Sequence, residues 1–124
     1  MKMTIPIDAI PQGRPRFYNG VAVDPPKSRQ FKKDFAQLVS MLRTDSAIYT
    51  GELSVELHIY RNIKVTSQRY GDIDNLVKGI FDALTGVLWK DDRQVTELLV
   101  TKNFADTPHV ELTVEEEFKC GNKQ

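Results

Sequence analysis

Apolar and polar side chains alternate strictly along the stretch Leu53-Ser54-Val55-Glu56-Leu57-His58-Ile59-Tyr60. This period of two predicts a β-strand with one buried face, because successive side chains of a strand point to opposite faces of the sheet. Residues 95–104 and the alternating run 110–114 predict two further strands, joined as a β-hairpin through the turn at 105–108. Another strand is expected over residues 4–10, at an edge of the sheet because Pro6 interrupts it.

Two segments have the period of helices. Apolar residues recur at spacings of three and four over residues 28–42 and 73–84, and Gly86 suits the end of the second helix. Residues 11–26 are rich in proline and glycine, which predicts an extended loop with a short hairpin through Val21-Ala22-Val23. The order of elements indicates an α+β fold, with a small mixed β-sheet and two main helices packed on one face. We expect residues 1–118 to form a single domain and residues 119–124 a polar C-terminal tail.

Length and composition exclude several classes of protein. The chain has 124 residues, 40% of them hydrophobic, which suits one folded domain. It contains no apolar run near the ~20 residues of a membrane span and no secretory signal at its start, so we expect a cytoplasmic protein without membrane contact. The single cysteine, Cys120, excludes an internal disulfide and a cysteine-based zinc site. The glycines form no phosphate-binding loop, so no nucleotide cofactor is expected.

The net charge of zero hides an uneven distribution of charge along the chain. Residues 1–43 carry eight basic and three acidic side chains, whereas residues 70–98 carry three basic and six acidic ones. A basic segment rich in arginine and aromatic residues is suited to DNA phosphates and bases, although a solvated arm and the polar face of a helix explain it equally well. The candidate DNA-binding residues are Arg14, Arg16, Lys27, Arg29, Lys32, Lys33 and Arg69.

The acidic segment contains two carboxylate pairs, Asp72 with Asp74 and Asp91 with Asp92, on either side of the second predicted helix. Each pair alone is explained by helix capping or by a surface turn. If the pairs meet in space, their mutual repulsion favours a cation between them. Oxygen ligands select Mg²⁺ or Mn²⁺ over zinc.

Lys78 lies four residues after Asp74 and four before Asp82, so the three share one face of that helix. Two ordinary ion pairs would explain this spacing. The alternative is that Lys78 points into the acidic site, where a fixed cation stabilises charge on a transferring phosphoryl group.

A longer pattern extends these observations. The run Asp72-Ile73-Asp74-Asn75-Leu76-Val77-Lys78-Gly79-Ile80-Phe81-Asp82-Ala83-Leu84, followed by Asp91-Asp92-Arg93-Gln94-Val95, closely resembles the RusA family of Holliday junction resolvases. Gly13-Arg14-Pro15-Arg16 is similar to the basic N-terminal segment of many members. The resemblance covers about a quarter of the chain directly.

The resemblance implies a Mg²⁺-dependent homodimeric endonuclease, commonly encoded by phages and prophages, that resolves four-way DNA junctions by paired nicks in recombination and repair. It implies that Asp72, Asp74 and Asp92 are the catalytic and metal-binding residues and that Lys78 is the essential lysine, while Asp91 has no assigned role. Asp72, Asp74, Lys78 and Asp92 are therefore expected to converge in space. A nuclease acting on forks or flaps, or a non-catalytic DNA-binding module of replication or recombination, remains an alternative.

Overall fold

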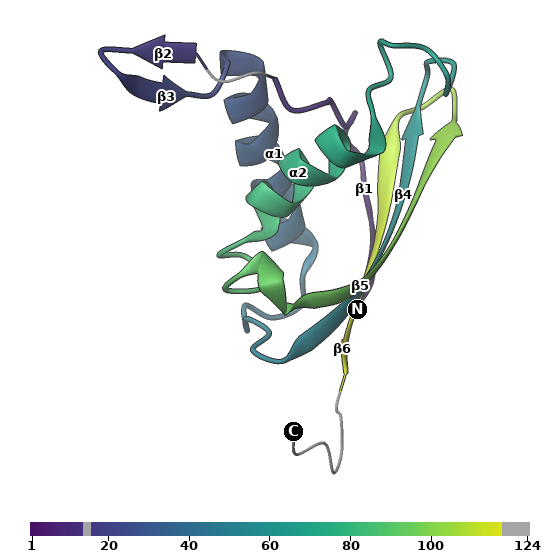
Figure 1. Cartoon of the computed structure of the whole chain (residues 1–124). Coiled ribbons are helices and arrows are strands. Elements are labelled where there is room, and N and C mark those ends of the chain that lie inside the picture. The colour runs from purple at the N-terminus through teal and green to yellow at the C-terminus, as the bar shows by residue number, and fades with distance from the viewer. Residues whose placement is uncertain (14–15, 118–124) are drawn as a thin grey trace.

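A four-stranded sheet and two helices make up most of the fold (Figure 1). The computed structural model describes residues 1–13 and 16–117, so Arg14 and the expected tail at 119–124 lie outside the described residues. The elements, in chain order, are β1 (Lys2–Ile5), β2 (Arg16–Tyr18), β3 (Val21–Val23), α1 (Pro26–Leu42), β4 (Glu52–Arg61), α2 (Ile73–Leu84), η1 (Asp92–Gln94), β5 (Val95–Phe104) and β6 (His109–Glu117). This arrangement confirms the α+β class, and within these ranges no helix is long and apolar enough to cross a membrane.

The alternating strand β4 lies inside the sheet, whose strand order is β1-β6-β4-β5. Its four apolar side chains, Leu53, Val55, Leu57 and Ile59, are almost completely buried. Strand β6 runs antiparallel to both β1 and β4, whereas β5 runs parallel to β4, so the sheet is mixed as expected.

The predicted β-hairpin between β5 and β6 is wrong, because β4 lies between these two strands. Strand β4 has the most completely buried face and takes two neighbours, while β5 keeps residues 96–99 exposed at the edge. A parallel pair cannot be joined by a tight turn and needs a crossover connection. Here α2 lies in that connection, between β4 and β5 in the chain.

Strand β1 is shorter and earlier than the predicted strand at residues 4–10. It ends at Ile5, which pairs with Val110, because Pro6 has no N–H to donate to the neighbouring strand. Its place at the edge of the sheet is as expected.

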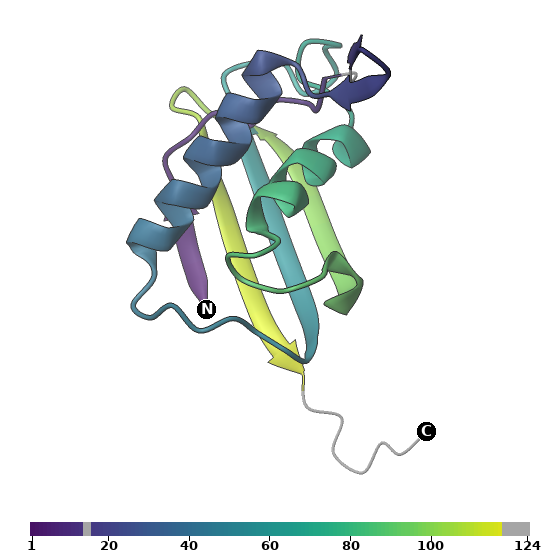
Figure 2. The same ribbon diagram turned by 90° about the vertical axis from the view of Figure 1, so that its left-hand side faces the viewer.

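Both helices cover the same face of the sheet (Figure 2). Helix α1 buries Phe31, Phe35 and Val39, and it begins two residues earlier than predicted because Pro26 suits a first helical position. Helix α2 has the predicted bounds and buries Leu76 and Ile80.

The predicted short hairpin is present as β2 and β3, which project from the body of the molecule at the start of α1 (Figure 1). Asn19 and Gly20 connect the strands with φ angles of 52° and 80°. Two successive residues with positive φ are typical of the turn that matches the twist of a tight hairpin.

Candidate functional site

The first carboxylate pair lies at the start of α2. Asp72 occupies the N-cap position, but its side chain makes no capping hydrogen bond, and Asp74 lies in the first turn. Both side chains are exposed, and neither forms an ion pair with another described residue. A capping hydrogen bond therefore does not account for Asp72, and the side chains of both residues are accessible to a ligand.

Side chains from β4 and β5 fix the peptide that precedes Asp72. Arg61, which is 5% exposed, donates hydrogen bonds to the carbonyl oxygens of Arg69 and Tyr70 at 3.1 and 2.7 Å. Lys102 donates to the carbonyl oxygen of Gly71 at 2.9 Å, and its ammonium lies 4.8 Å from the centre of the Tyr70 ring. The start of α2 is thus held by hydrogen bonds from two neighbouring strands.

Tyr70 anchors the same peptide from inside the core. Its side chain is fully buried, and its hydroxyl lies within hydrogen-bonding distance of the carbonyl oxygens of Ile59 and Asn103 at 2.9 and 2.8 Å. Burial raises the pKa of this phenol above its ordinary value, so Tyr70 stays neutral at physiological pH. Asp8 completes the anchor by accepting a hydrogen bond from Arg61 at 2.8 Å.

Gly71 is required by the backbone at this point. Its φ is +99°, and a Cβ built on it would lie 2.8 Å from Cβ of Pro11. Side chains disfavour this left-handed conformation, and the contact with Pro11 excludes even a methyl group without a shift.

The second carboxylate pair lies beyond the other end of α2, and its two members differ. Asp91 accepts hydrogen bonds from the backbone and the guanidinium of Arg93 at 2.8 and 2.9 Å, while the Gln94 side chain accepts from the Asp91 backbone at 3.0 Å. The hydrogen bonds from Arg93 lower the pKa of Asp91. Asp91 therefore caps η1, whereas the exposed side chain of Asp92 makes no hydrogen bond or ion pair within residues 1–13 and 16–117. This difference agrees with a role for Asp92 rather than Asp91 in binding a ligand.

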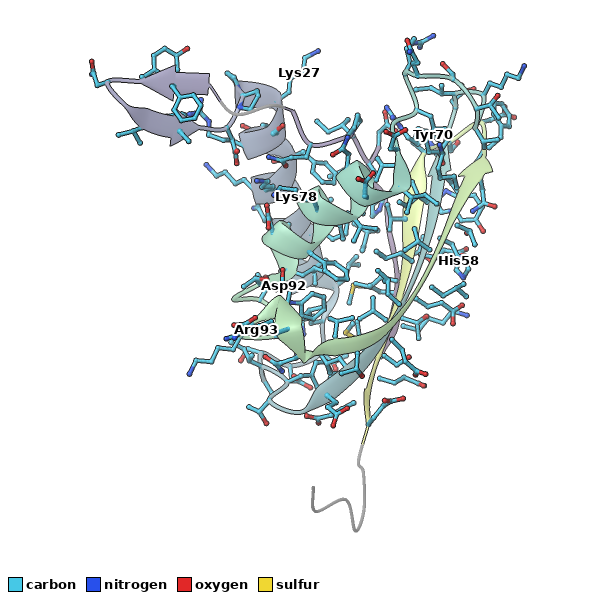
Figure 3. The ribbon with its side chains drawn as sticks, in the orientation of Figure 1. Lys27, His58, Tyr70, Lys78, Asp92 and Arg93 are labelled. Carbon is cyan, nitrogen blue, oxygen red and sulfur yellow. The ribbon has the colours of Figure 1, made fainter. Side chains whose placement is uncertain are left out.

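The two pairs do not meet within one chain. Helix α2 has 12 residues and is therefore about 18 Å long, and Asp72 precedes its first turn. Figure 3 shows Asp92 near one end of α2 and Tyr70 near the other. No group of three or more acidic, histidine or cysteine side chains that could hold a metal ion occurs among the residues that the structure describes. The expected convergence is therefore absent from the single chain.

Lys78 lies between the two pairs along α2 (Figure 3). Its side chain is exposed, and the two ion pairs that its spacing allows, with Asp74 and with Asp82, are absent from the described part of the chain. Asp82 instead lies 3.2 Å from Lys32. The Lys78 ammonium is thus available to an anionic ligand.

The candidate DNA-binding residues fall into distinct environments. Lys27, Arg29 and Lys33 are exposed on α1, and Arg69 is exposed in the loop before α2. Lys32 is engaged within the protein, since its ammonium lies 2.6 Å from Asp24 and 3.2 Å from Asp82 and its side chain is only 18% exposed. Burial opposes the charge on Lys32, but its hydrogen bonds to both carboxylates raise its pKa overall.

Arg16 belongs to β2, and Arg14 lies outside the described residues.

The sequence reasoning missed the residues that hold the start of α2. Arg61 follows Ile59 at the next inward position of the alternating strand, and Lys102 pairs with Ile59 across the sheet. A basic residue at a position where the alternation places buried apolar side chains indicates a buried, hydrogen-bonded cation. The sequence contained this signal at both positions.

Two comparisons with known proteins bear on the chain. The sequence profile of a family described as Endodeoxyribonuclease RusA matches residues 6–115. A protein of Bacillus subtilis (strain 168), described as uncharacterized protein YqaN, is 34% identical over 137 aligned positions, which cover 94% of this chain and 96% of that protein.

Proposed function

The chain belongs to the RusA family of endodeoxyribonucleases, and from this premise we propose that it cuts four-way DNA junctions at a Mg²⁺ site shared between two copies of the chain. In this proposal, Asp72 and Asp74 of one subunit lie beside Asp92 of the partner subunit. The observation that carries it is the separation of uncommitted carboxylates at opposite ends of α2.

Two-fold symmetry supports such a shared site. A two-fold axis that passes beside the middle of α2, at right angles to the helix, places the α2 helices of two copies antiparallel, so that each end of one helix lies beside the opposite end of the other. Asp92 of the partner subunit would then lie near Asp72, and each dimer would contain two equivalent sites. Paired cuts in a symmetric junction require two sites of this kind.

The edge strand β5 is a suitable surface for the dimer contact. It has β4 as a neighbour on one side and no described strand on the other. Large apolar side chains are exposed along β5 and at the adjacent start of α2, namely Leu98, Leu99, Phe104 and Ile73. Contiguous exposed apolar residues beside an open sheet edge favour association with another chain.

The donor set fits a hard divalent cation, because it consists of exposed carboxylates whose side chains have no ion-pair partner in the described part of the chain. The chemistry that Mg²⁺ supplies at such a site is activation of water and stabilisation of the leaving oxygen. The ammonium of Lys78 would balance charge on the phosphoryl group during its transfer. The hydrogen bonds of Arg61, Tyr70 and Lys102 would hold the start of α2 in place, and so fix the position of its two carboxylates relative to the scissile phosphate.

Mixing two inactive variants tests the shared site. Asp72→Asn and Asp92→Asn should each reduce cleavage of a synthetic four-way junction on the order of a hundredfold or more, while junction binding persists. In an equal mixture with subunit exchange, about half of the dimers contain one copy of each variant. Such a mixed dimer has one intact site and one doubly altered site, so the mixture should regain single-strand nicking without paired cuts.

If all three carboxylates acted within one chain, the mixture would stay inactive, and the shared site would be wrong. Asp106→Asn, in the turn after β5, is the matched control and should cleave normally. Wild-type cleavage of junction, fork and linear duplex, with and without Mg²⁺, tests the substrate. Equal cleavage of forks, or cleavage without a divalent cation, would overturn that part of the proposal.

A further inference from the structure

The hairpin β2–β3 presents apolar side chains to solvent. Phe17 is 74% exposed, Tyr18 is 59% exposed and Val21 is 61% exposed. The hairpin projects from the body of the molecule beside the start of α1, away from the sheet (Figure 1). Neighbouring exposed aromatic side chains on a projecting element are typical of a binding surface.

The base of the hairpin is firmly attached. Asp24, one residue after β3, accepts hydrogen bonds from Lys32 at 2.6 Å and from Gln12 at 3.2 Å. On the other side, the backbone N–H of Gly13 donates to Oγ of Ser28 at 2.9 Å. A two-stranded hairpin with three-residue strands is marginal alone, so these contacts set the direction in which it projects.

The charge around the hairpin favours an anionic partner. Lys27, Arg29 and Lys33 are exposed on the first turns of α1, next to the hairpin. The nearby carboxylate of Asp24 is neutralised by Lys32. Basic residues that surround exposed aromatic rings are the combination that binds nucleic acid through phosphates and base faces together.

We propose that the hairpin places Phe17 and Tyr18 against unstacked base faces at the branch point of the DNA, and so distinguishes a junction from a continuous duplex. In a duplex every internal base pair is stacked on both sides, and inserting a ring costs unstacking energy. At an opened branch point the terminal pairs of the arms already expose their faces, so the rings stack without that cost. The inference rests on the proposed function, which leaves open how a branch is recognised.

Replacement of the rings tests this role. Phe17→Ala with Tyr18→Ala should weaken binding to four-way junctions about tenfold or more, and should leave binding to linear duplex unchanged. Phe17→Trp, which keeps a stacking ring, should retain junction binding, whereas Phe17→Leu should not. Met41→Ala removes another side chain that is 71% exposed, on the last turn of α1, and serves as the control.

A fluorescent base gives a direct readout that does not depend on cleavage. With 2-aminopurine at the branch point, the wild-type protein in EDTA should change the fluorescence, and the double alanine variant should not. Equal binding and fluorescence of both proteins would overturn the proposal. A change in oligomeric state on removal of the rings, with an unchanged fluorescence signal, would instead assign the hairpin to contact with a second copy.

Failure of the proposed nuclease function can be distinguished from failure of the hairpin proposal. Asp72→Asn should still bind the four-way junction and give the wild-type fluorescence change. A chain that binds branch points through the hairpin but cuts no DNA would contradict the nuclease proposal alone.

Discussion

Asp91 and Asp92 are neighbours in the sequence but belong to different environments. The carboxylate of Asp91 is used in capping η1 and in binding Arg93, while Asp92 is exposed and uncommitted. A carboxylate that already accepts several hydrogen bonds loses them when it binds a cation, so Asp92 can bind a ligand at lower cost. The local hydrogen bonds, rather than the residue type, separate the two aspartates.

Gly71 and Gly86 allow a matched test of the backbone before α2. Both have positive φ, +99° and +91°, but a Cβ on Gly71 would lie 2.8 Å from Pro11, and one on Gly86 would meet nothing within 4 Å. Gly86→Ala should reduce the free energy of unfolding by about 1–2 kcal/mol, from backbone strain alone. Gly71→Ala should cost about 1–3 kcal/mol more, because a contact must also be relieved.

Urea unfolding of the two variants measures this difference. Equal destabilisation would show that Pro11 moves aside at no cost in free energy. The positive φ would then be the whole reason that position 71 requires glycine.

At the scale of elements, Lys32 links three parts of the chain. Its ammonium binds Asp24 at the base of the hairpin and Asp82 on α2, while Lys32 itself belongs to α1. A single cation between two carboxylates is a strong constraint on their relative positions. Lys32 therefore orients the hairpin, and direct contact between this side chain and DNA would break both pairs.

This link predicts a dependence of stability on pH. The hydrogen bond from Lys32 is the largest cause of the lowered pKa of Asp24, and burial acts in the opposite direction. A carboxyl with a lower pKa in the folded state contributes stability above its unfolded-state pKa, and that stability is lost as the pH falls through the folded-state value. Asp24→Asn should therefore reduce the loss of unfolding free energy between about pH 5 and pH 3, and with it the fall in Tm; the difference should be no more than about 1 kcal/mol because the pair is partly solvated.

Thermal unfolding at several pH values checks this effect, with Asp106→Asn as the control. A wild-type slope in Asp24→Asn would show that the pair with Lys32 adds no stability.

Periodicity within one element was a reliable guide, and pairing between elements was not. The bounds of α2 followed from the spacing of Leu76, Ile80 and Leu84 and from Gly86. The place of β5 in the sheet could not be derived in this way. Two consecutive strands joined by a short turn, as β5 and β6 are, suit a hairpin as well as two strands separated by a third. The choice depends on which strand competes best for the central position, and this is a property of the whole sheet.

At the scale of the molecule, the two faces of the sheet differ in charge, because one is mainly acidic and the helical side carries charges of both signs. The face away from the helices carries the carboxylates of Glu56, Glu97, Glu111 and Glu115. The side that the helices cover carries the exposed cations Lys27, Arg29 and Lys33 on α1. Despite a whole-chain charge of zero, the cations of α1 give the helical side a local positive surface for DNA phosphates, whereas the carboxylates of the opposite face repel DNA.

The salt dependence of DNA binding should reveal this difference between the two faces. Replacing Lys27, Arg29 and Lys33 with alanine should weaken DNA binding uniformly across sequences and reduce the slope of log affinity against log salt by about 3, if each contacts one phosphate. Lys2→Ala, on the face of the sheet away from the helices, should leave the slope unchanged. Titrations at several salt concentrations measure both slopes, and equal slopes would place DNA on another surface.

The candidate site shows where reasoning from sequence stops. The prediction of Asp72, Asp74, Lys78 and Asp92 as site residues followed from their spacing and from a family pattern, but the expectation that they meet assumed that one chain contains the site. Asp72 precedes the 12-residue helix α2 and Asp92 follows it in η1, and the described residues contain no group of three or more carboxylate, histidine or cysteine side chains that could hold a metal ion. The path of the connection between α2 and η1 decides this separation, and the periodicity of the sequence does not predict that path.

The pairing of β1 with β6 also affects how the chain acquires its fold. Strand β1 is the first described strand to be synthesised and β6 the last, yet the two are hydrogen-bonded neighbours in the sheet. During translation, β1 would have no partner strand until β6 emerges from the ribosome. Contacts between residues so far apart in the sequence slow folding. The nascent protein would complete this sheet only after β6 has been translated.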